Sequence, residues 1–182
     1  MTRATVTGAS GLVGANLVRR LLDAGVEVRA ADLRRSVAID DLDIDFVEVD
    51  VRDATSLAAA FQGADVVFHL AAMISIVGDP TGDVWEVNVG GPANAANAAR
   101  SAGVTRFVHC SSVHAFDLEK CGPSLDETGP RTIGDHAPVY DRSKFAGEQG
   151  LLAAAGDELD VVIVNPTGVI GRHDHTPSRT GE

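Results

Sequence analysis

The sequence predicts an α/β protein with a doubly wound parallel sheet and helices on both faces. Short runs rich in Val, Ile and Phe alternate along the chain with Ala- and Leu-rich segments of helical period. Strands that alternate with helices form βαβ units, and their right-handed crossovers leave a ligand crevice at the carboxyl ends of the strands. A length of 182 residues, 45% of them hydrophobic, suits one packed domain. We therefore expect residues 1–182 to form a single domain.

Strands are expected where β-branched and aromatic residues gather, and helices between them. In the first helix an apolar repeat ends at Gly25. Asp53 is a suitable N-cap for a second helix, which would run to Phe61 and end at Gly63. Longer helical segments cover about Val84–Ala102 and Tyr140–Ala155. The expected strands are Ala4–Thr7, Glu27–Ala31, Asp45–Glu48, Asp65–Leu70, Arg106–Cys110 and Asp160–Val164.

Two loops are too long to be simple connectors. They cover Ile74–Asp83 and Ala115–Pro138, and both follow strands on the ligand side of the predicted sheet. Long loops at this edge commonly form part of a binding site. We therefore expect both loops to border the ligand.

Composition narrows the class of partner. The net charge is -11 and no block of like charge occurs, which argues against nucleic acid or an anionic membrane surface as the main partner. No apolar stretch reaches the roughly twenty residues that span a bilayer. The amino end enters the first strand without a basic-then-apolar leader, and two cysteines, Cys110 and Cys121, suit a reduced chain. We therefore expect a cytoplasmic protein with a small-molecule partner.

The stretch TGASGLVG, residues 7–14, has the context of a dinucleotide-binding turn, because it follows a strand and opens a helix. Gly8 lets the chain turn tightly, and Gly11 removes a side chain where a pyrophosphate would touch the backbone. Gly14 lets the helix pack closely on the strand, while the helix amino end offers free N–H groups to the phosphates. The alternative is an ordinary Gly-rich turn.

Asp32 bears on the choice of cofactor. It follows the second strand, where a carboxylate can accept hydrogen bonds from both ribose hydroxyls of an adenosine. A carboxylate there repels a 2′-phosphate, which favours NAD over NADP. Arg34 and Arg35 follow closely and could offset that repulsion.

The stretch YDRSK holds the only tyrosine of the chain, Tyr140, four places before Lys144. On a helix the two side chains share one face. A nearby ammonium would lower the pKa of the phenol and make it a usable general acid or base. A strand-end hydroxyl, Ser111 or Ser112, could hold a substrate carbonyl oxygen for Tyr140 to protonate. The alternatives are a surface tyrosine and an ordinary strand-end turn.

The histidines carry less information. His173 and His175 could be read as a metal pair, but two imidazoles on a loop without a third ligand are thin support, and we predict no metal site. His69, His109 and His114 lie near predicted strand ends, where a packed histidine is the common case, although His114 could touch the substrate.

With these motifs in order, the chain resembles the extended short-chain dehydrogenase/reductase superfamily, in particular its NAD-dependent epimerase/dehydratase and dihydroflavonol-reductase-like members. TGASGLVG resembles that family's TGxxGxxG turn, and DVRD, residues 50–53, its acidic adenine contact. HLAA, residues 69–72, is similar to the segment beside the cofactor, and VNPTGVIG, residues 164–171, to the segment that approaches the nicotinamide. The resemblance implies a Rossmann fold, a Ser112–Tyr140–Lys144 triad with Ser111 structural, and a homodimer through helices that include the Tyr140 helix.

The cofactor-binding residues predicted from the motifs and the resemblance together are Gly8, Ser10, Gly11, Leu12, Val13, Gly14, Asp32, Arg34, Asp50, Val51, Leu70, Ala71, Ala72, Asn88, Tyr140, Lys144, Pro166 and Val169.

The chain also departs from the family. Many relatives have Tyr-Gly where this chain has Phe116-Asp117, and many sugar-nucleotide members have Arg where it has Asn165. Asn165 looks more like the reductase branch. Family members continue into a small substrate-binding domain, which we expect to be absent here. The chain is then either a fragment, which we favour, or a natural cofactor-binding half.

The function predicted is that of an NAD(P)-dependent oxidoreductase, with NAD favoured. Hydride would pass between the nicotinamide and a carbinol or ketone carbon, while Tyr140 moves the hydroxyl proton. Lys144 would lower the pKa of Tyr140 and hold the nicotinamide ribose, and Ser112 would orient the substrate oxygen. The alternatives are a sugar-nucleotide epimerase or dehydratase that retains its cofactor, and a non-catalytic dinucleotide-binding sensor.

Overall fold

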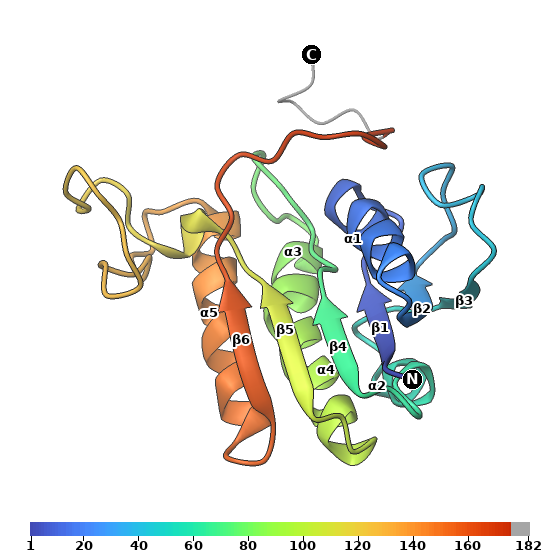
Figure 1. Ribbon diagram of the computed structural model, residues 1–182. Helices are drawn as coiled ribbons and strands as arrows, with labels where there is room; N and C mark the ends of the chain where they lie inside the picture. Colours follow the sequence, from blue (N-terminus) through green and yellow to red (C-terminus); the bar gives the residue numbers. More distant parts are fainter. Residues whose placement is uncertain (176–182) are drawn as a thin grey trace.

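A single parallel sheet of six strands forms the centre of the molecule, in the order β3-β2-β1-β4-β5-β6. The computed structural model describes residues 1–175. All strands point the same way, so their carboxyl ends meet at the upper edge of the sheet in Figure 1. The doubly wound order predicted from the alternation of strands and helices is confirmed. The strands are β1 (Arg3–Thr7), β2 (Glu27–Asp32), β3 (Asp45–Glu48), β4 (Val66–His69), β5 (Arg106–Cys110) and β6 (Asp160–Val164).

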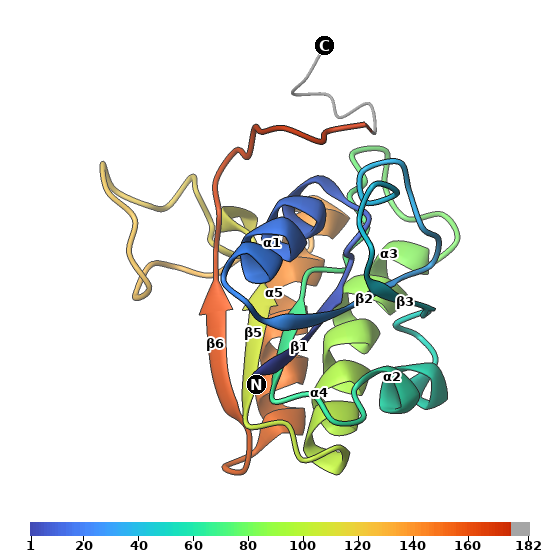
Figure 2. The ribbon, with the colours of Figure 1, turned by 45° about the vertical axis from the view of Figure 1, so that its right-hand side comes forward.

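Helices cover both faces of this sheet (Figure 2). On one face α1 (Leu12–Asp23) packs its buried Val18 on apolar residues of β1 and β2 such as Val6 and Ala30. On the other face lie α2 (Ala54–Ala60), α4 (Gly91–Ser101) and α5 (Val139–Ala155), whose apolar sides enclose Val67 and Phe107. Two cores therefore hold the sheet between them.

Part of the α1 face is open. Over β5 and β6 no helix of residues 1–175 covers the sheet, and Val162 and Val164 are 38% and 43% exposed there (Figure 1). The elements on the α5 face, by contrast, bury Phe107 completely. The sheet is thus fully covered only between β1 and β2, where α1 lies.

Most predicted boundaries hold within a residue, because they rest on specific local signals. The Asp53 carboxylate accepts the N–H of Thr55 and caps α2 as expected. Gly25 takes a left-handed backbone, with φ +75°, just after α1. β4 is one residue shorter than predicted at each end, although the N–H groups of Asp65 and Leu70 still donate to the carbonyls of Arg3 and Thr7 in β1.

The helical segment predicted over about Val84–Ala102 is confirmed, but one turn of it is π-helical rather than α-helical. A turn of α-helix, α3 (Asp83–Trp85), passes into a wider π-helical turn, η1 (Glu86–Gly90), before α4 begins. Pro92 explains the change, because it has no N–H to donate to the carbonyl of Asn88 four residues earlier. That carbonyl instead faces Gly147 of α5, where a Cβ would lie only 2.1 Å from it.

Both long loops leave the carboxyl edge of the sheet. The first follows β4 and leads to α3, and the second follows β5 through a 3-10 turn, η2 (Val113–Ala115), and leads to α5. In Figure 1 both rise beside the upper ends of the strands. None of the helices in residues 1–175 has the length and apolar composition that a bilayer crossing requires.

Candidate active site

A cavity of about 410 Å³ opens at the carboxyl ends of β1, β2 and β4. This is the crevice expected for a ligand of a doubly wound sheet. Nine of the predicted cofactor-binding residues line it: Gly8, Ser10, Gly11, Asp32, Asp50, Val51, Leu70, Ala71 and Ala72. The other predicted residues lie outside its wall: Leu12, Val13, Gly14, Arg34, Asn88, Tyr140, Lys144, Pro166 and Val169.

The three glycines of the first turn have different surroundings. Gly8 has φ +68°, and a Cβ on it would lie 2.7 Å from the amide nitrogen of Ala71. A Cβ on Gly14 would lie 2.1 Å from the carbonyl oxygen of Gly8. A Cβ on Gly11 would meet only that same oxygen, at an ordinary 3.5 Å. The protein itself requires glycine at 8 and 14, whereas the space at Gly11 belongs to the cavity.

Helix α1 begins beside this space. Gly11 is its N-cap and provides no side-chain hydrogen bond to the first turn. The first N–H groups of a helix have no intrahelical partner, and they carry the positive end of the helix dipole. Leu12 and Val13 therefore present backbone donors at the cavity mouth, an arrangement suited to a phosphate.

The carboxylate of Asp32 is fixed in the cavity wall. One oxygen accepts the N–H of Ser10 at 2.9 Å, and the other accepts the N–H of Leu33 at 2.8 Å. Burial raises the pKa of Asp32, and these two backbone hydrogen bonds lower it. The turn is tied further to the loop after β2, because the Ser10 hydroxyl donates to the carbonyl of Arg34 and the Ser36 hydroxyl donates to the carbonyl of Ser10.

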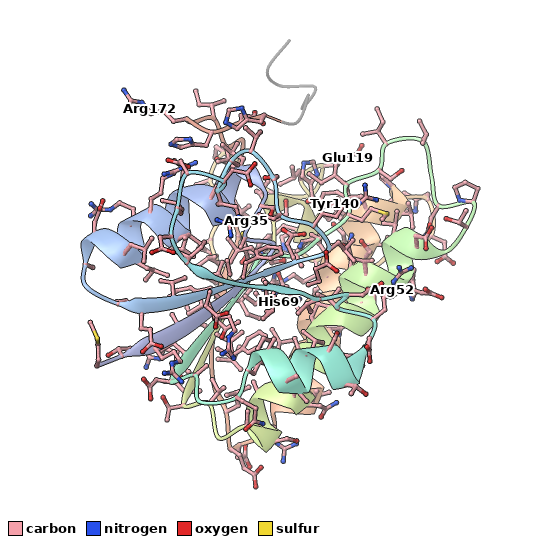
Figure 3. All side chains as sticks on the ribbon, turned by 90° about the vertical axis from the view of Figure 1, so that its right-hand side faces the viewer. Arg35, Arg52, His69, Glu119, Tyr140 and Arg172 are labelled. Carbon is pink, nitrogen blue, oxygen red and sulfur yellow. The ribbon has the colours of Figure 1, made fainter. Side chains whose placement is uncertain are left out.

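The side chain of Arg35 is not available to offset the repulsion between Asp32 and a 2′-phosphate. Its guanidinium donates to the carbonyls of Ile39 and Leu42 and lies 3.5 Å from the Asp40 carboxylate. It is therefore bound within its own loop, which Figure 3 shows at the same end of the molecule as Tyr140. Arg34 is exposed, and its side chain is absent from the cavity lining.

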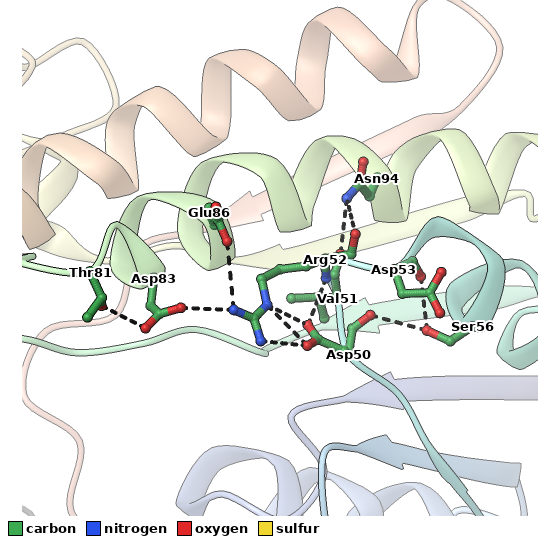
Figure 4. Close-up of polar contacts among 9 residues, drawn as sticks. All are labelled: Asp50, Val51, Arg52, Asp53, Ser56, Thr81, Asp83, Glu86 and Asn94. Atoms are coloured by element: carbon green, nitrogen blue, oxygen red, sulfur yellow. Dashed lines mark hydrogen bonds and ion pairs between the residues drawn. The ribbon is translucent and has the colours of Figure 1, made fainter.

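Arg52 holds the far wall of the cavity, a role that we did not predict from the sequence (Figure 4). Its guanidinium donates to both oxygens of Asp50 and to Asp83, and it lies 3.7 Å from Glu86. These contacts connect the turn after β3 with the start of α3. The Arg52 guanidinium also keeps the pKa of Asp50 below its usual value. The aspartate predicted to contact adenine is thus held in place by a residue two positions along.

Asn88 positions the cavity wall without lining it. It is 2% exposed, and its side-chain amide bonds both the N–H and the carbonyl of Met73, each at 2.8 Å. The same amide nitrogen donates to the hydroxyl of Ser143 on α5. Because Met73 lines the cavity, Asn88 links the loop after β4 to the helix that carries Tyr140.

The structure brings Ser112, rather than Ser111, to Tyr140. Burial raises the pKa of Tyr140, and a hydrogen bond with the side chain of Ser112 lowers it. The Ser112 hydroxyl also accepts the N–H of His114 at 3.2 Å. The hydroxyl of Ser111 is buried without a hydrogen-bond partner among the described residues.

Lys144 does not lower the pKa of Tyr140 as the spacing predicted. Its Nζ donates to the carbonyl oxygen of Cys110 at 3.1 Å, and burial lowers its own pKa. The net direction at Tyr140 is upward, because desolvation of the phenolate outweighs its hydrogen bond. The thiol of Cys110 and the carboxylate of Asp141 add to this rise.

His114 lies next to the phenol. Its ring meets the Tyr140 ring edge-on at 5.9 Å, and its Nδ1 is 3.3 Å from the Asp141 carboxylate. Half of the imidazole is exposed, so it can touch a molecule that reaches Tyr140. On the other side of the turn, Pro166 accepts the N–H of Val113, and Val169 is 39% exposed.

Two buried histidines, His69 and His109, form a floor at the carboxyl ends of β4 and β5, and Figure 3 labels the first of them. Thr7, His69 and His109 lie side by side on adjacent strands. His69 Nδ1 is hydrogen-bonded to the Thr7 hydroxyl at 2.9 Å, and the two imidazoles stack with their centres 5.5 Å apart. Burial lowers the pKa of His69 to about 3 and that of His109 in the same direction. Both rings are therefore neutral at physiological pH.

Fold and cavity together define a dinucleotide-binding protein of the short-chain dehydrogenase/reductase type. Residues 4–181 match the NAD-dependent epimerase/dehydratase family, and the chain belongs to that family. The resemblance seen in the motifs is thereby confirmed, and NAD is confirmed as the cofactor at the level of the family.

Named relatives fall on both sides of the reductase and epimerase division. A putative dihydroflavonol 4-reductase from Synechocystis is 39% identical over 97% of this chain and 52% of its own length. A UDP-glucose 4-epimerase from Mycolicibacterium smegmatis is 43% identical over 93% of this chain and 56% of its own length. A short-chain dehydrogenase/reductase superfamily protein from Agrobacterium tumefaciens, solved with bound NAD, is 30% identical and superposes with a TM-score of 0.76 over 90% of this chain and 48% of its own. The chain spans about half the length of the relatives that it matches.

Proposed function

We propose that this chain is the cofactor-binding part of an NAD-dependent oxidoreductase that converts a carbinol to a ketone or the reverse. The observation that carries the proposal is the space at Gly11. No contact within residues 1–175 requires glycine there, yet the position lines the cavity beside the uncapped end of α1 and the fixed Asp32 carboxylate. A dinucleotide needs these three features together: a phosphate site, room for the pyrophosphate and an acceptor for ribose hydroxyls.

In this proposal Gly8, Gly11 and the first turn of α1 hold the pyrophosphate of NAD. Asp32 accepts the adenosine ribose hydroxyls, while Asp50 and Val51 border the adenine. When bound, NAD supplies the hydride acceptor or donor. The donor set fits the group, because the Asp32 oxygens retain acceptor capacity after their two backbone hydrogen bonds.

The remaining chemistry belongs to the protein side chains. The Ser112 hydroxyl orients the substrate oxygen, and the Tyr140 phenol gives or takes its proton. A phenol is protonated at neutral pH, and burial raises the pKa of Tyr140 further, so Tyr140 carries the proton that a ketone oxygen would take. Lys144 lies about one turn further along α5, where its Nζ, held by the carbonyl of Cys110, would bind the nicotinamide ribose.

NADH binding, followed by its fluorescence, tests the cofactor assignment directly. We expect tight NADH binding and weak NADPH binding. Asp32→Asn should weaken NADH binding about tenfold. It should also narrow the preference for NADH over NADPH, because the amide no longer repels a 2′-phosphate. Asp43→Asn, an exposed aspartate of the loop after β2, is the matched control. Equal affinity for NADH and NADPH in the unaltered chain would contradict the assignment of Asp32.

A second candidate is an epimerase that keeps its cofactor, because the Mycolicibacterium relative carries the name of a sugar-nucleotide epimerase. The content of nucleotide after denaturation separates the two candidates. An epimerase of this kind co-purifies with stoichiometric NAD, whereas a dehydrogenase exchanges it with solvent. A homodimer and a cytoplasmic location stay predictions.

A further inference from the structure

One buried carboxylate joins three segments around Ser112. Glu148 lies on α5 and is 4% exposed. One of its oxygens accepts a hydrogen bond from Nη1 of Arg131 at 3.1 Å, and the other accepts a hydrogen bond from Nδ2 of Asn165 at 2.7 Å. Arg131 belongs to the long loop after β5, and Asn165 follows β6. The carboxylate therefore connects the helix that carries Tyr140 with both neighbouring segments.

These contacts reach Ser112 through Asn165. The same Nδ2 that donates to Glu148 also donates to the carbonyl oxygen of Ser112, at 3.0 Å. A chain of two hydrogen bonds thus runs from α5 to the backbone of Ser112.

A second set of contacts holds the segment just after Ser112. Phe116 pairs with Arg131 in an antiparallel bridge, and the N–H of Asp117 donates to the carbonyl of Pro130. The Arg131 guanidinium lies 3.9 Å above the ring of Phe116. The backbone of Ser112 is therefore connected to Glu148 through Asn165, and the segment just after it is connected to Glu148 through Arg131.

Stability alone does not explain this arrangement. Burial of an ion pair has a large desolvation cost, and apolar residues of similar volume often stabilise a protein equally well. A carboxylate with one directional donor on each oxygen does something that apolar residues cannot, because it fixes the orientation of its partners. The amide of Asn165 has this property as well, since one nitrogen serves two acceptors.

We propose that Glu148 is a positioning residue, which holds the Ser112 hydroxyl against the phenol of Tyr140. The inference rests on the proposed function, in which Ser112 and Tyr140 act on the substrate oxygen. Tyr140 and Glu148 share one helix, about two turns apart. Without the carboxylate, the Ser112 turn keeps the backbone bonds of Ser111 to the end of β6 and of Val113 to Pro166, but loses this link to α5.

The single tyrosine of the chain gives a direct readout. Replacing it biosynthetically with 3-fluorotyrosine gives one ¹⁹F resonance and a phenol that titrates at lower pH than tyrosine. The pKa of this phenol is to be measured in the parent chain, in Ser112→Ala, in Glu148→Gln and in the double variant. Loss of the serine hydrogen bond should raise the phenol pKa by about half a unit to one unit.

If Glu148 acts through Ser112, Glu148→Gln raises this pKa as Ser112→Ala does, and the double variant shows no further rise. Glu158→Gln is the matched control, because it removes the carboxylate of an exposed pair with Arg100 just beyond α5. It should leave the phenol pKa unchanged. Additive shifts in the double variant, or a Glu148→Gln chain that loses stability without a pKa shift, would overturn the proposal.

Asn165→Ala keeps the test decisive if Glu148→Gln does not fold. It removes the middle of the hydrogen-bond chain and leaves the Arg131–Glu148 pair in place. An unchanged phenol pKa in that variant overturns the proposal. Neither measurement needs cofactor or substrate, so failure of NADH binding would count against the proposed function and leave the positioning role standing.

Discussion

At the scale of single residues, the glycine turn separates what the fold needs from what a ligand needs. Gly8 and Gly14 sit against backbone atoms that cannot move aside cheaply, while Gly11 has an extended backbone at φ -84° that any residue adopts. Three glycines of one motif thus have two different physical causes. Sequence spacing alone cannot distinguish them, because the neighbours at Gly8 come from the segment just after β4, far along the chain.

Alanine at two of these positions should give opposite results. Gly11→Ala should change the free energy of unfolding by less than about 0.5 kcal/mol and weaken NADH binding at least about tenfold. Gly14→Ala should cost about 3 kcal/mol or more, because its methyl group would overlap the carbonyl of Gly8. Urea unfolding and NADH titration of both variants check this. A Gly11→Ala chain that binds NADH normally would contradict the assignment of that space to the pyrophosphate.

A second prediction at this scale concerns the phenol of Tyr140. Tyr140→Phe should abolish the proposed turnover, with NADH affinity changed less than about threefold, because the ring stays and only the hydroxyl is lost. Steady-state assays with a carbonyl substrate and the same fluorescence titration measure the two effects. Retained turnover would remove Tyr140 from the proposed chemistry.

At the scale of elements, α4 and α5 come together through the π-helical turn. Pro92 frees the carbonyl of Asn88, and Gly147 leaves the space into which that carbonyl points. The helical period of the sequence identified both helices but not the wider turn between α3 and α4. A proline near the start of a helix reads as an ordinary first-turn residue unless the partner across the interface is known.

Two glycines of α5 give a matched pair for this contact. Gly147→Ala should destabilise the chain by about 2 kcal/mol or more, because its Cβ would lie 2.1 Å from the Asn88 oxygen. Gly150→Ala should stabilise it by about 0.5 to 1 kcal/mol, because a Cβ there meets only ordinary contacts, the nearest at 3.6 Å, and alanine favours the helix. Thermal and urea unfolding of both variants test the pair. Equal destabilisation by the two would mean that helix α5 tolerates no side chain on this side.

The distinction between local signals and contacts with distant segments also decides how much of the site could be predicted from the sequence. Gly8, Asp32 and the helix cap at Asp53 follow from local pattern, because residues next to them in the sequence mark the turn, the strand end and the cap. Arg52 and Glu148 could not be found in this way. Their partners, Asp83 and Glu86 in one case and Arg131 and Asn165 in the other, come from distant segments, and charged residues of this kind are most often solvated. The direction of the Tyr140 pKa was wrong for a related reason, because burial of the phenol is a tertiary property.

At the scale of the whole molecule, the neutral histidines of the floor make stability depend on pH. The pKa of His69 is about 3 in the fold, against an ordinary value of 6.5. The unfolded chain therefore binds the proton first, and stability present above pH 6.5 is lost as the pH falls toward the folded value. His69 alone should remove about 2 kcal/mol between about pH 6.5 and pH 5.

Urea unfolding at several pH values measures this slope. His69→Gln should flatten it, since the amide does not titrate and can still bond Thr7, whereas His136→Gln, at an exposed position, should not. Imidazole NMR resonances of His69 and His109 should show no titration while the chain stays folded. A folded chain whose His69 titrates near pH 6 would disprove the burial argument.

The order of the strands has a consequence for how the chain is made. β1 is synthesised first, yet it occupies the middle of the sheet, between β2 and β4. Its pairing with β4 joins residues about sixty positions apart, such as Ala4 and Val66. Gly8 meets its neighbour Ala71 only after that pairing. Since contacts between distant segments form late in folding, a nascent chain carries its glycine turn incomplete until β4 and Ala71 have left the ribosome. The first motif to be translated is therefore among the last to take its shape.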